Sequence, residues 1–550
     1  MRAIVLSMIL VTAQAQEFLE PPRFPDKSYF KHHFSVETPR VELQPPVRLA
    51  DFVVGDKLEL TIKSYIELVL ANNTDIHIQK LTVETPKNAI MRAFAAWDPF
   101  VQATFRSTRT VSQSNNVLEG ARVSQNLAQP LNVNYQQTLD NGAQYVIGFG
   151  GSKNTSNATF ATFNPSLTAN LNMNFTQPLM RNRGRFVNRI PVMLARSRLR
   201  SAEFNMYDQI LRILQTAENA YWSVVESREA LRVQEQALNL ADTNLKRYER
   251  ELEIGAISEL DIYLPQQNKA NAEILMTQAR YRLQQFEDAL RRQIGADLES
   301  QFRNMPLVLT ETVLPPTDER AIDKEALVEM AFQKRPDLKA AQQNIDIDDL
   351  NFRSAKNSLL PDLSLGGQYT STGRGGPFQV RQDIFAGDGT QSSVISTIPG
   401  GLGDAVSRLF GFNFPTYGFS LSLRMPIRDR RAAADLADAT ISKRNTLLRI
   451  RNTEQTIRQD VYNAITQVES SRASVKLAQT SVEFSQKRRD AEQKKYDLGV
   501  STIFLVLDAD NALTRSKADL VTNSVQYRRN LTNLLRVTGQ LLDERGVAIQ

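Results

Sequence analysis

The amino-acid sequence predicts a mixed α and β fold in which one arrangement of strands and very long helices is built twice. Three observations predict it: features that recur at fixed offsets, long stretches without proline or glycine, and shorter stretches that alternate apolar with polar residues. The 550 residues exceed the length of about 100–200 that is typical of one domain, so several domains or an internal repeat are expected. A content of 41% hydrophobic and 23% charged residues is typical of a folded chain.

The N-terminal sequence predicts export. Met1-Arg2 precedes an apolar run, and Ala13-Gln14-Ala15 has the small-x-small pattern of a cleavage site, so residues 1–15 are predicted to be a signal peptide, with a buried core helix as the alternative. Residues 16–57 are rich in proline and have little periodicity, which is typical of an extended N-terminal segment. No later segment has the run of about 18 apolar residues that a membrane-spanning helix needs, which leaves a β-barrel as the only way to cross a bilayer.

Recurring features divide the rest of the chain into two halves. Residues 66–76 align with residues 328–338, and the two segments carry Asn73-Thr-Asp and Arg335-Pro-Asp. Further along, Gly255 matches Gly499 and Gly295 matches Gly539, both at an offset of 244 residues. We therefore predict a first repeat at 58–298, a linker at 299–325, a second repeat at 326–540 and a C-terminal tail at 541–550.

Long helices are predicted in both halves. The 72 residues between Pro426 and Gly499 contain no proline or glycine, enough for a helix of roughly 100 Å at about 1.5 Å per residue. Residues 192–254 form a similar stretch, and each helix resumes after its glycine, as in an antiparallel hairpin whose first helix ends at that glycine. Apolar and small residues in strict 4-3 spacing predict a left-handed coiled coil; they are Ile457, Val461, Ala464, Val468, Ser471, Val475, Ala478, Val482 and Ser485.

Strands are predicted between the helices. Residues 100–106, 167–177, 363–365 and 417–424 alternate apolar with polar side chains, and strands of about ten residues with this pattern are typical of transmembrane barrels. About four such strands per chain cannot close a barrel, and an open edge in lipid would leave backbone groups unpaired, so oligomerisation is expected. A soluble sheet is the alternative.

Two further regions are interpreted as surface loops at one end of the barrel. Residues 131–149 predict a hairpin whose turn is Asp140-Asn-Gly142, but this hairpin has no counterpart in the second half. Residues 371–415 are rich in glycine and lack a clear period. We therefore assign residues 113–165 and 371–415 to loops.

The composition excludes several classes of function. The formal charge of +6 is the difference between 66 basic and 60 acidic residues that are intermixed, which gives no support to a nucleic-acid partner. Cysteine is absent, and the three histidines follow no helical ligand pattern, so no metal site and no cofactor are predicted. No catalytic motif is found, and we predict that the chain is not an enzyme.

Helix, strands and a long helical hairpin, repeated once behind a signal peptide, resemble the TolC family of outer-membrane efflux and secretion channels over roughly residues 58–540. The resemblance implies a homotrimer in which each chain gives four strands to one outer-membrane β-barrel, continued by an α-helical coiled-coil tunnel in the periplasm. It implies a passive exit duct of a tripartite efflux pump or type I secretion system. The implied partners are outer-membrane lipid, a periplasmic adaptor (membrane fusion) protein and, through it, an inner-membrane pump or ABC transporter.

The resemblance also implies two sets of site residues. The adaptor would dock at the hairpin tips, which are Gly255, Ala256, Ile257, Ser258, Gly499, Val500, Ser501 and Thr502. Helix capping by Ser and Thr beyond the glycine turns is the alternative explanation of these tips. A periplasmic gate would use Asp261, Tyr496 and Asp508, although Ser501 and Leu505 stand where the family pattern has an arginine and a second aspartate. Ordinary solvated helix surface is the alternative for all three gate residues.

A trimeric coiled-coil envelope tether or adhesin is the rival function. It would share the signal peptide, the long helices and the oligomeric state. The internal repeat argues against it, because a tether needs one continuous stalk, whereas two antiparallel hairpins beside paired strands suit a bore with two ends.

Overall fold

The computed structural model describes residue 29 and residues 45–113, 122–158, 161–313, 323–381 and 394–547. The predicted signal peptide lies outside the described residues, as do residues 16–28 and 30–44 of the predicted N-terminal segment. The chain divides into two compact units: unit 1 contains residues 1–88, 200–342 and 448–550, and unit 2 contains residues 89–199 and 343–447. Each unit therefore combines segments of both predicted repeats.

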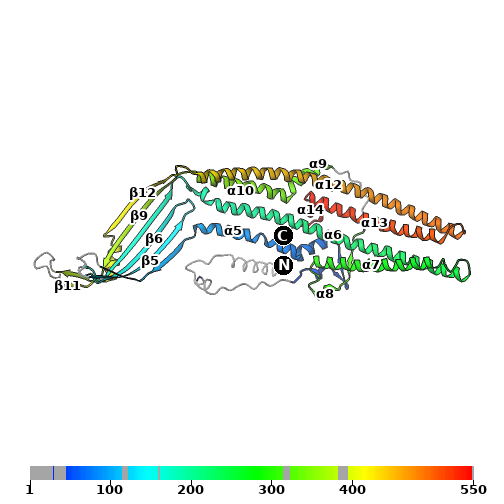
Figure 1. The fold of residues 1–550 in the computed structure, drawn as a ribbon, viewed down its shortest axis with the longest axis horizontal. Helices are drawn as coiled ribbons and strands as arrows, with labels where there is room; N and C mark the ends of the chain where they lie inside the picture. The colour runs from blue at the N-terminus through cyan, green and yellow to red at the C-terminus, as the bar shows by residue number, and fades with distance from the viewer. Residues whose placement is uncertain are drawn as a thin grey trace. The chain divides into compact units, whose positions relative to one another are not determined.

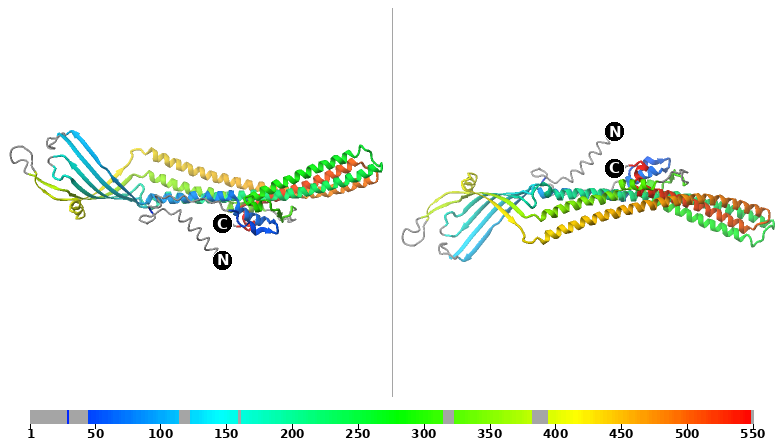
Figure 2. Two further views of the ribbon diagram at one scale, coloured as in Figure 1. Left: turned by 90° about the horizontal axis from the view of Figure 1, so that it is seen from below. Right: turned by 90° about the horizontal axis from the view of Figure 1, so that it is seen from above.

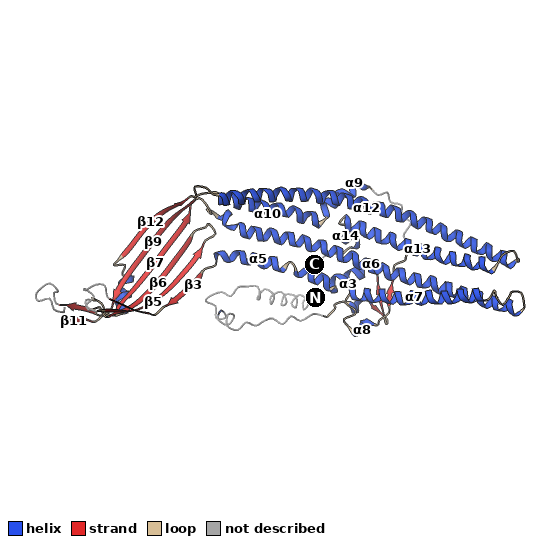
Figure 3. Ribbon diagram, in the orientation of Figure 1, coloured by secondary structure: helices blue, strands red, loops and turns tan. Residues whose placement is uncertain are grey.

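Four long helices follow the predicted proline-free and glycine-free stretches (Figures 1 and 3). The first of these helices begins at Arg185, before the stretch that starts at residue 192, and it includes Pro191. The predicted seam is buried over most of its length: Ile457, Val461 and Val468 are fully buried, whereas Val482 and Ser485 near its end are half-buried. The four helices are α6 (Arg185–Glu253), α7 (Tyr263–Gln293), α12 (Arg430–Asp497) and α13 (Ile503–Val537).

Unit 1 also contains a small sheet and several short helices. Strand β2 (Lys57–Leu60) pairs antiparallel with β1 (Val53–Val54) and parallel with β8 (Leu307–Leu309). A hydrophobic core of the unit surrounds Tyr65, Tyr221 and Trp222, and the Tyr65 hydroxyl donates to the Ala217 carbonyl at 3.1 Å. The short helices are η1 (Leu49–Phe52), α3 (Ile62–Asn72), α4 (Thr74–Leu81), α8 (Ser300–Arg303), α9 (Lys324–Lys334) and α14 (Leu541–Arg545), while α5 (Glu84–Phe94) and α10 (Pro336–Ser358) contribute to both units.

The two aligned segments at the repeat starts have the same local structure. A single residue, Asn73, separates α3 from α4, and a single residue, Arg335, separates α9 from α10. Both are buried and extended rather than helical. The Asn73 side chain accepts from the N–H groups of Asp75 and Ile76, as expected of an N-cap.

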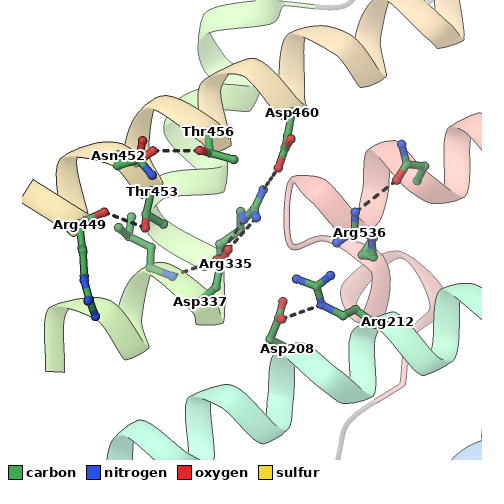
Figure 4. A network of polar contacts seen from close by, with 12 residues as sticks. Asp208, Arg212, Arg335, Asp337, Arg449, Asn452, Thr453, Thr456, Asp460 and Arg536 are labelled. Atoms are coloured by element: carbon green, nitrogen blue, oxygen red, sulfur yellow. Dashed lines mark hydrogen bonds and ion pairs between the residues drawn. The ribbon is translucent and has the colours of Figure 1, made fainter. Parts of the chain in front are cut away.

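Arg335, which separates α9 from α10, is held in place by ion pairs (Figure 4). Its guanidinium lies 2.7 Å from Asp337 at the start of α10 and 3.3 Å from Asp460 on α12. A buried guanidinium needs both charge compensation and hydrogen-bond acceptors, and these two carboxylates supply them. The break between α9 and α10 is thereby tied to the long helix α12.

Unit 2 contains an antiparallel sheet in the order β12-β9-β7-β6-β5-β3, with β4 also paired to β5 (Figures 1 and 2). Strands β3 and β4 pair with successive parts of β5 and form one interrupted edge strand. The sheet therefore has six strand positions, and the prediction of about four is wrong. Its strands are β3 (Phe100–Phe105), β4 (Thr108–Gln113), β5 (Val123–Thr138), β6 (Gln144–Ser156), β7 (Ser166–Pro178), β9 (Asp362–Gly375) and β12 (Pro415–Arg424).

The difference lies in the region that we assigned to a surface loop. The predicted hairpin with its Asn141-Gly142 turn exists, but it joins β5 to β6, two long strands that lie between β3 and β7. Residues 113–165 are therefore largely strands of the sheet rather than loop; residues 114–121, 159 and 160 of this region lie outside the described part. Sequence comparison of the two halves missed these strands because the second half has no equivalent.

The second predicted loop also contains regular structure. Strands β10 (Phe378–Arg381) and β11 (Val394–Ile398) form a separate two-stranded sheet, and α11 (Leu402–Phe410) follows; residues 382–393 lie outside the described ranges. Helix α11 packs Ala405 and Leu409 against Ala169 of β7. None of the helices in the described ranges is long and apolar enough to cross a membrane.

Candidate functional site

The tips of the two long hairpins in unit 1 have the same backbone geometry. Gly255 and Gly499 have left-handed φ angles of 75° and 77°. At the first tip, the N–H of Gly255 donates to Leu252 at 2.9 Å and that of Ala256 to Glu251 at 2.8 Å, and the second tip repeats both bonds at 2.9 Å. This pattern is a Schellman cap, which closes a helix end and requires a residue that tolerates positive φ. The predicted reversals at both glycines are confirmed.

Helix capping by Ser258 and Thr502 is not observed. Helix α7 begins only at Tyr263, after a separate turn in which the Ser258 N–H donates to the Asp261 carboxylate at 3.2 Å and the Ser258 hydroxyl accepts from the Leu260 N–H at 3.3 Å. Thr502 stands at the N-cap of α13, but its side chain makes no capping hydrogen bond. Capping therefore explains neither residue, and this alternative is wrong.

Apolar side chains are exposed at both tips. Ile254 and Leu498, which precede the two glycines, are each 79% exposed, and Val500 is 75% exposed. Leu260 and Phe504 are exposed beyond the turns. Apart from Val500, these residues form pairs at the repeat offset of 244, so each hairpin presents the same apolar pattern. Paired apolar side chains at an extremity are typical of a surface that another molecule covers.

A cluster that we call the inter-hairpin latch joins α6 to α12 just behind the tips. It consists of Arg247 and Glu251 on α6 and Tyr496 and Asp497 on α12. The Tyr496 hydroxyl donates to Glu251 at 2.6 Å, and Arg247 bonds Asp497 at 2.6 Å and Glu251 at 2.9 Å. The guanidinium of Arg247 also lies 5.4 Å from the centre of the Tyr496 ring.

The electrostatics of the latch favour its hydrogen bond and its ion pair at neutral pH. Burial and the hydrogen bond to Glu251 raise the pKa of Tyr496, so the hydroxyl remains a donor. The Arg247 guanidinium holds the pKa of Asp497 below its usual range, so the ion pair is complete well below neutral pH.

A second link lies deeper in the bundle and joins three helices. Asp510 on α13 is buried, accepts from Asn244 on α6 at 2.8 Å and pairs with Arg489 on α12 at 3.0 Å. Burial raises the pKa of Asp510, while the bonds to Arg489 and Asn244 oppose that rise. Together with the apolar contacts of Tyr248, Ile262 and Ile503, this link holds the two hairpins against each other.

The three predicted gate residues have different surroundings. Asp261 and Tyr496 line one hollow of about 320 Å³ between the tips, together with Thr502 and Phe504. Among the described residues, Asp261 bonds only within its own turn at Ser258, whereas Tyr496 belongs to the latch. Asp508 is exposed and pairs with Arg488 at 2.7 Å, so its charge is compensated within the chain.

The sequence reasoning missed Arg247, Glu251, Asp497, Arg488 and Asp510. Arg247 and Glu251 have the i,i+4 spacing of a helical ion pair, and Asp497 follows Tyr496 directly, but such pairs are common on helix surfaces. Only the packing of α6 against α12 distinguishes them. Within the described residues, no group of three or more histidine, aspartate or glutamate side chains gathers where it could hold a metal ion.

The unit 2 sheet has one apolar and one polar face. On one face, Val133, Phe149 and Leu171 lie in register on β5, β6 and β7, and Leu365 pairs with Leu421 across β9 and β12. Helix α11 packs on this face. The Ala405 carbonyl lies so close to the β9 backbone at Gly373 that a side chain would not fit there. The opposite face carries amide and hydroxyl side chains, among them Asn132, Asn134, Asn170, Asn172, Asn174 and Thr370.

Part of the chain matches a known protein family. Residues 327–540 match the family described as outer membrane efflux protein. No curated protein sequence matches the chain significantly.

Several solved structures share the fold. A membrane protein from Pseudomonas aeruginosa is 16% identical with a TM-score of 0.61, over 89% of this chain and 91% of its own. The Campylobacter jejuni CmeC outer membrane channel is 14% identical with a TM-score of 0.59, over 92% and 90%. The open state of the Neisseria gonorrhoeae MtrE outer membrane channel is 16% identical with a TM-score of 0.55, over 87% and 89%.

Proposed function

We propose that this chain is the exit duct of a tripartite efflux pump or a type I secretion system. The premise is that it is a TolC-like protein with an outer membrane efflux protein domain at residues 327–540. It resides in the outer membrane with its helical hairpins in the periplasm, and it conducts cargo passively without catalysing a reaction. The structural observation that carries this proposal is the sheet of unit 2, whose two faces differ in polarity and whose outer edges, β3 and β12, are unpaired among the described strands.

The open edges support a homotrimer. The side chains of Tyr417, Phe419 and Leu421 on β12 are between 63% and 87% exposed, and Val101 and Phe105 on β3 are 64% and 66% exposed. Unpaired strand edges with apolar side chains cannot remain open in lipid, because each free N–H and C=O would lack a partner. Strands β12 and β3 run in opposite directions within the sheet, so β12 of one chain can pair antiparallel with β3 of the next.

The full-length protein is expected to purify as a trimer from detergent-solubilised outer membranes. Light scattering with correction for detergent measures the number of chains, and single-channel recording in planar bilayers tests conduction. A folded monomer that is stable without detergent would overturn the proposal, since it would show that neither edge needs a neighbour.

The tips are proposed to bind the periplasmic adaptor. The exposed apolar pairs Ile254/Leu498 and Leu260/Phe504 would be covered by a helical hairpin of the partner, and the glycine turns would hold them at the extremity. This role extends to Gly255, Ala256, Ile257 and Ser258 at the first tip and to Gly499, Val500, Ser501 and Thr502 at the second.

Replacing Gly499 with valine is expected to abolish most adaptor crosslinking and export, because a β-branched residue at a φ of 77° strains the turn by about 1–3 kcal/mol and displaces Val500. Site-specific crosslinking to the adaptor measures the effect. Gly403→Val on α11 is the matched control, since Gly403 has open space for a side chain and no positive φ. Full crosslinking by Gly499→Val would disprove the assignment of the tips.

A further inference from the structure

The sheet of unit 2 has more strand positions than the expected four per chain, and the two additional ones, β5 and β6, are integral to it. One polar-face row crosses all six positions through consecutive pairings, namely Gln102, Asn134, Gly148, Asn172, Thr370 and Thr416. The pairings of β5 with β6 and of β6 with β7 continue over thirteen and eleven residue pairs without a shift in register. A loosely attached hairpin would not keep register over this length.

Strands β5 and β6 also follow the two-faced pattern of the other strands. Val133 and Tyr135 on β5 and Ile147 and Phe149 on β6 lie on the apolar face, in register with Leu171 and Met173 of β7. On the polar face, Gly148 leaves the space that the side chain of Asn134 occupies, since a Cβ there would lie 2.5 Å from the Asn134 amide oxygen. A hairpin outside the barrel wall would not need one apolar face toward lipid and one polar face toward water.

The turn between β5 and β6 is anchored at the junction between β7 and α6. Asp140 pairs with Arg189 at 2.6 Å and with Arg185 at 3.4 Å. Gly142 has a φ of 90° and lies so close to the Asn182 carbonyl and the Asn188 amide that no side chain would fit. These contacts place the turn at the same end of the sheet as the start of the long helix, which is where a transmembrane barrel has its short turns.

We infer that, in the proposed trimer, each chain contributes six strand positions and the three chains close an eighteen-stranded barrel. This inference rests on the proposed function. The diameter of a barrel grows roughly in proportion to its strand number, so the bore would be about 1.5 times as wide as that of a twelve-stranded barrel with four strands per chain. Barrels of about 16–18 strands enclose an open aqueous channel.

The lining of this bore points to a class of cargo. The six residues of the polar row carry amides, hydroxyls or no side chain, and the neighbouring Asn132, Asn170 and Asn174 add further amides. Charged residues of the polar face, Asp362, Arg374 and Arg424, stand at the ends of β9 and β12. The barrel would therefore admit bulky, hydrated polar cargo of either charge sign, with discrimination by charge left to other parts of the conduit.

The absence of cysteine from the chain makes a direct test possible. In the sheet, Gln102 and Asn134 are cross-strand neighbours, about 5 Å apart, whereas Gln102 and Asn172 are separated by three strand spacings, or about 14 Å. If β5 and β6 were not part of the barrel wall, β3 would lie beside β7, and Gln102 and Asn172 would become neighbours. We expect the trimer of Gln102→Cys/Asn134→Cys to form a disulfide within the chain and that of Gln102→Cys/Asn172→Cys to form none, as measured by mass spectrometry of the digested protein.

Electron-microscopic projections of the trimer in nanodiscs provide a second measurement, with an expected barrel diameter about 1.5 times that of a twelve-stranded barrel. Asn134→Cys alone controls for crosslinks between trimers. A disulfide between positions 102 and 172, or a twelve-stranded diameter, in an intact trimer would overturn the inference and leave the channel function standing. A chain that forms no trimer would overturn the proposed function, and the shared barrel with it.

Discussion

Replacing Arg545 with alanine is expected to lower the free energy of unfolding of unit 1 by about 3–5 kcal/mol, because it leaves a buried carboxylate without its counter-charge. Glu218 on α6 is fully buried, and the Arg545 guanidinium contacts both of its oxygens, with Nε 3.2 Å from Oε2. Thr532 on α13 donates to the same carboxylate at 2.6 Å. A neutral hydroxyl cannot replace the charge of the guanidinium.

A double variant separates the loss of the ion pair from the effect of shortening the Arg545 side chain. The double variant Glu218→Met/Arg545→Met should recover most of the stability, because a buried ion pair that is replaced by apolar side chains of similar volume is often neutral. Lys476→Ala on the exposed surface of α12 is the control and should change stability by less than about 0.5 kcal/mol. Urea unfolding followed by circular dichroism measures all three. An unchanged midpoint for Arg545→Ala would mean that the pair between Glu218 and Arg545 does not stabilise unit 1.

This pair also shows what the sequence could not reveal about the C-terminus. We predicted residues 541–550 as a tail, yet residues 541–545 form α14, which buries Leu541 and holds Arg545 against Glu218. Nothing in a five-residue helix predicts docking onto a helix more than 300 residues earlier, since the contact depends on the tertiary arrangement. Residues 548–550 lie outside the described residues.

The parts of the fold that the sequence predicted depend on local rules. The 4-3 spacing of Ile457 to Ser485 marks a buried seam because it follows from helix geometry alone. Paired glycines at a constant offset predicted the reversals because a Schellman cap needs positive φ. Gly295 and Gly539 confirm the same rule, with φ angles of 71° and 74°.

The parts that the sequence did not predict depend on which segments become neighbours. Alternation identified residues 131–149 as a hairpin, but alternation cannot tell whether a hairpin joins the main sheet, and the missing counterpart in the second half suggested a loop. The latch was missed for a similar reason. Arg247, Glu251 and Asp497 are three charged residues among many on long helices, and only the contact between α6 and α12 selects them.

Replacing Tyr496 with phenylalanine is expected to raise the open probability of the resting channel by about tenfold to a hundredfold. The substitution keeps the ring, which packs edge-on against Tyr248 at 5.7 Å, and removes only the hydroxyl that donates to Glu251. A hydrogen bond of this kind contributes about 1 kcal/mol net, so three copies in the proposed trimer would favour closure by up to about 3 kcal/mol. Each 1.4 kcal/mol corresponds to about tenfold in an equilibrium constant, here that of the proposed gate between closed and open tips.

Bilayer recordings at fixed salt measure this effect, and a double-mutant cycle with Glu251→Gln assigns it to the latch. If the hydroxyl acts through Glu251, the two substitutions together should open the channel little more than either one alone. Tyr248→Phe is the matched control, because the Tyr248 ring lies in the same apolar cluster while its hydroxyl takes no part in the bond to Glu251. Asp261→Ala should have the smaller effect, because Asp261 bonds only within its own turn, and so should Asp508→Asn, because Arg488 already compensates that charge. Equal effects from Tyr496→Phe and Tyr248→Phe would show that the bond between Tyr496 and Glu251 has no special part in holding the tips together.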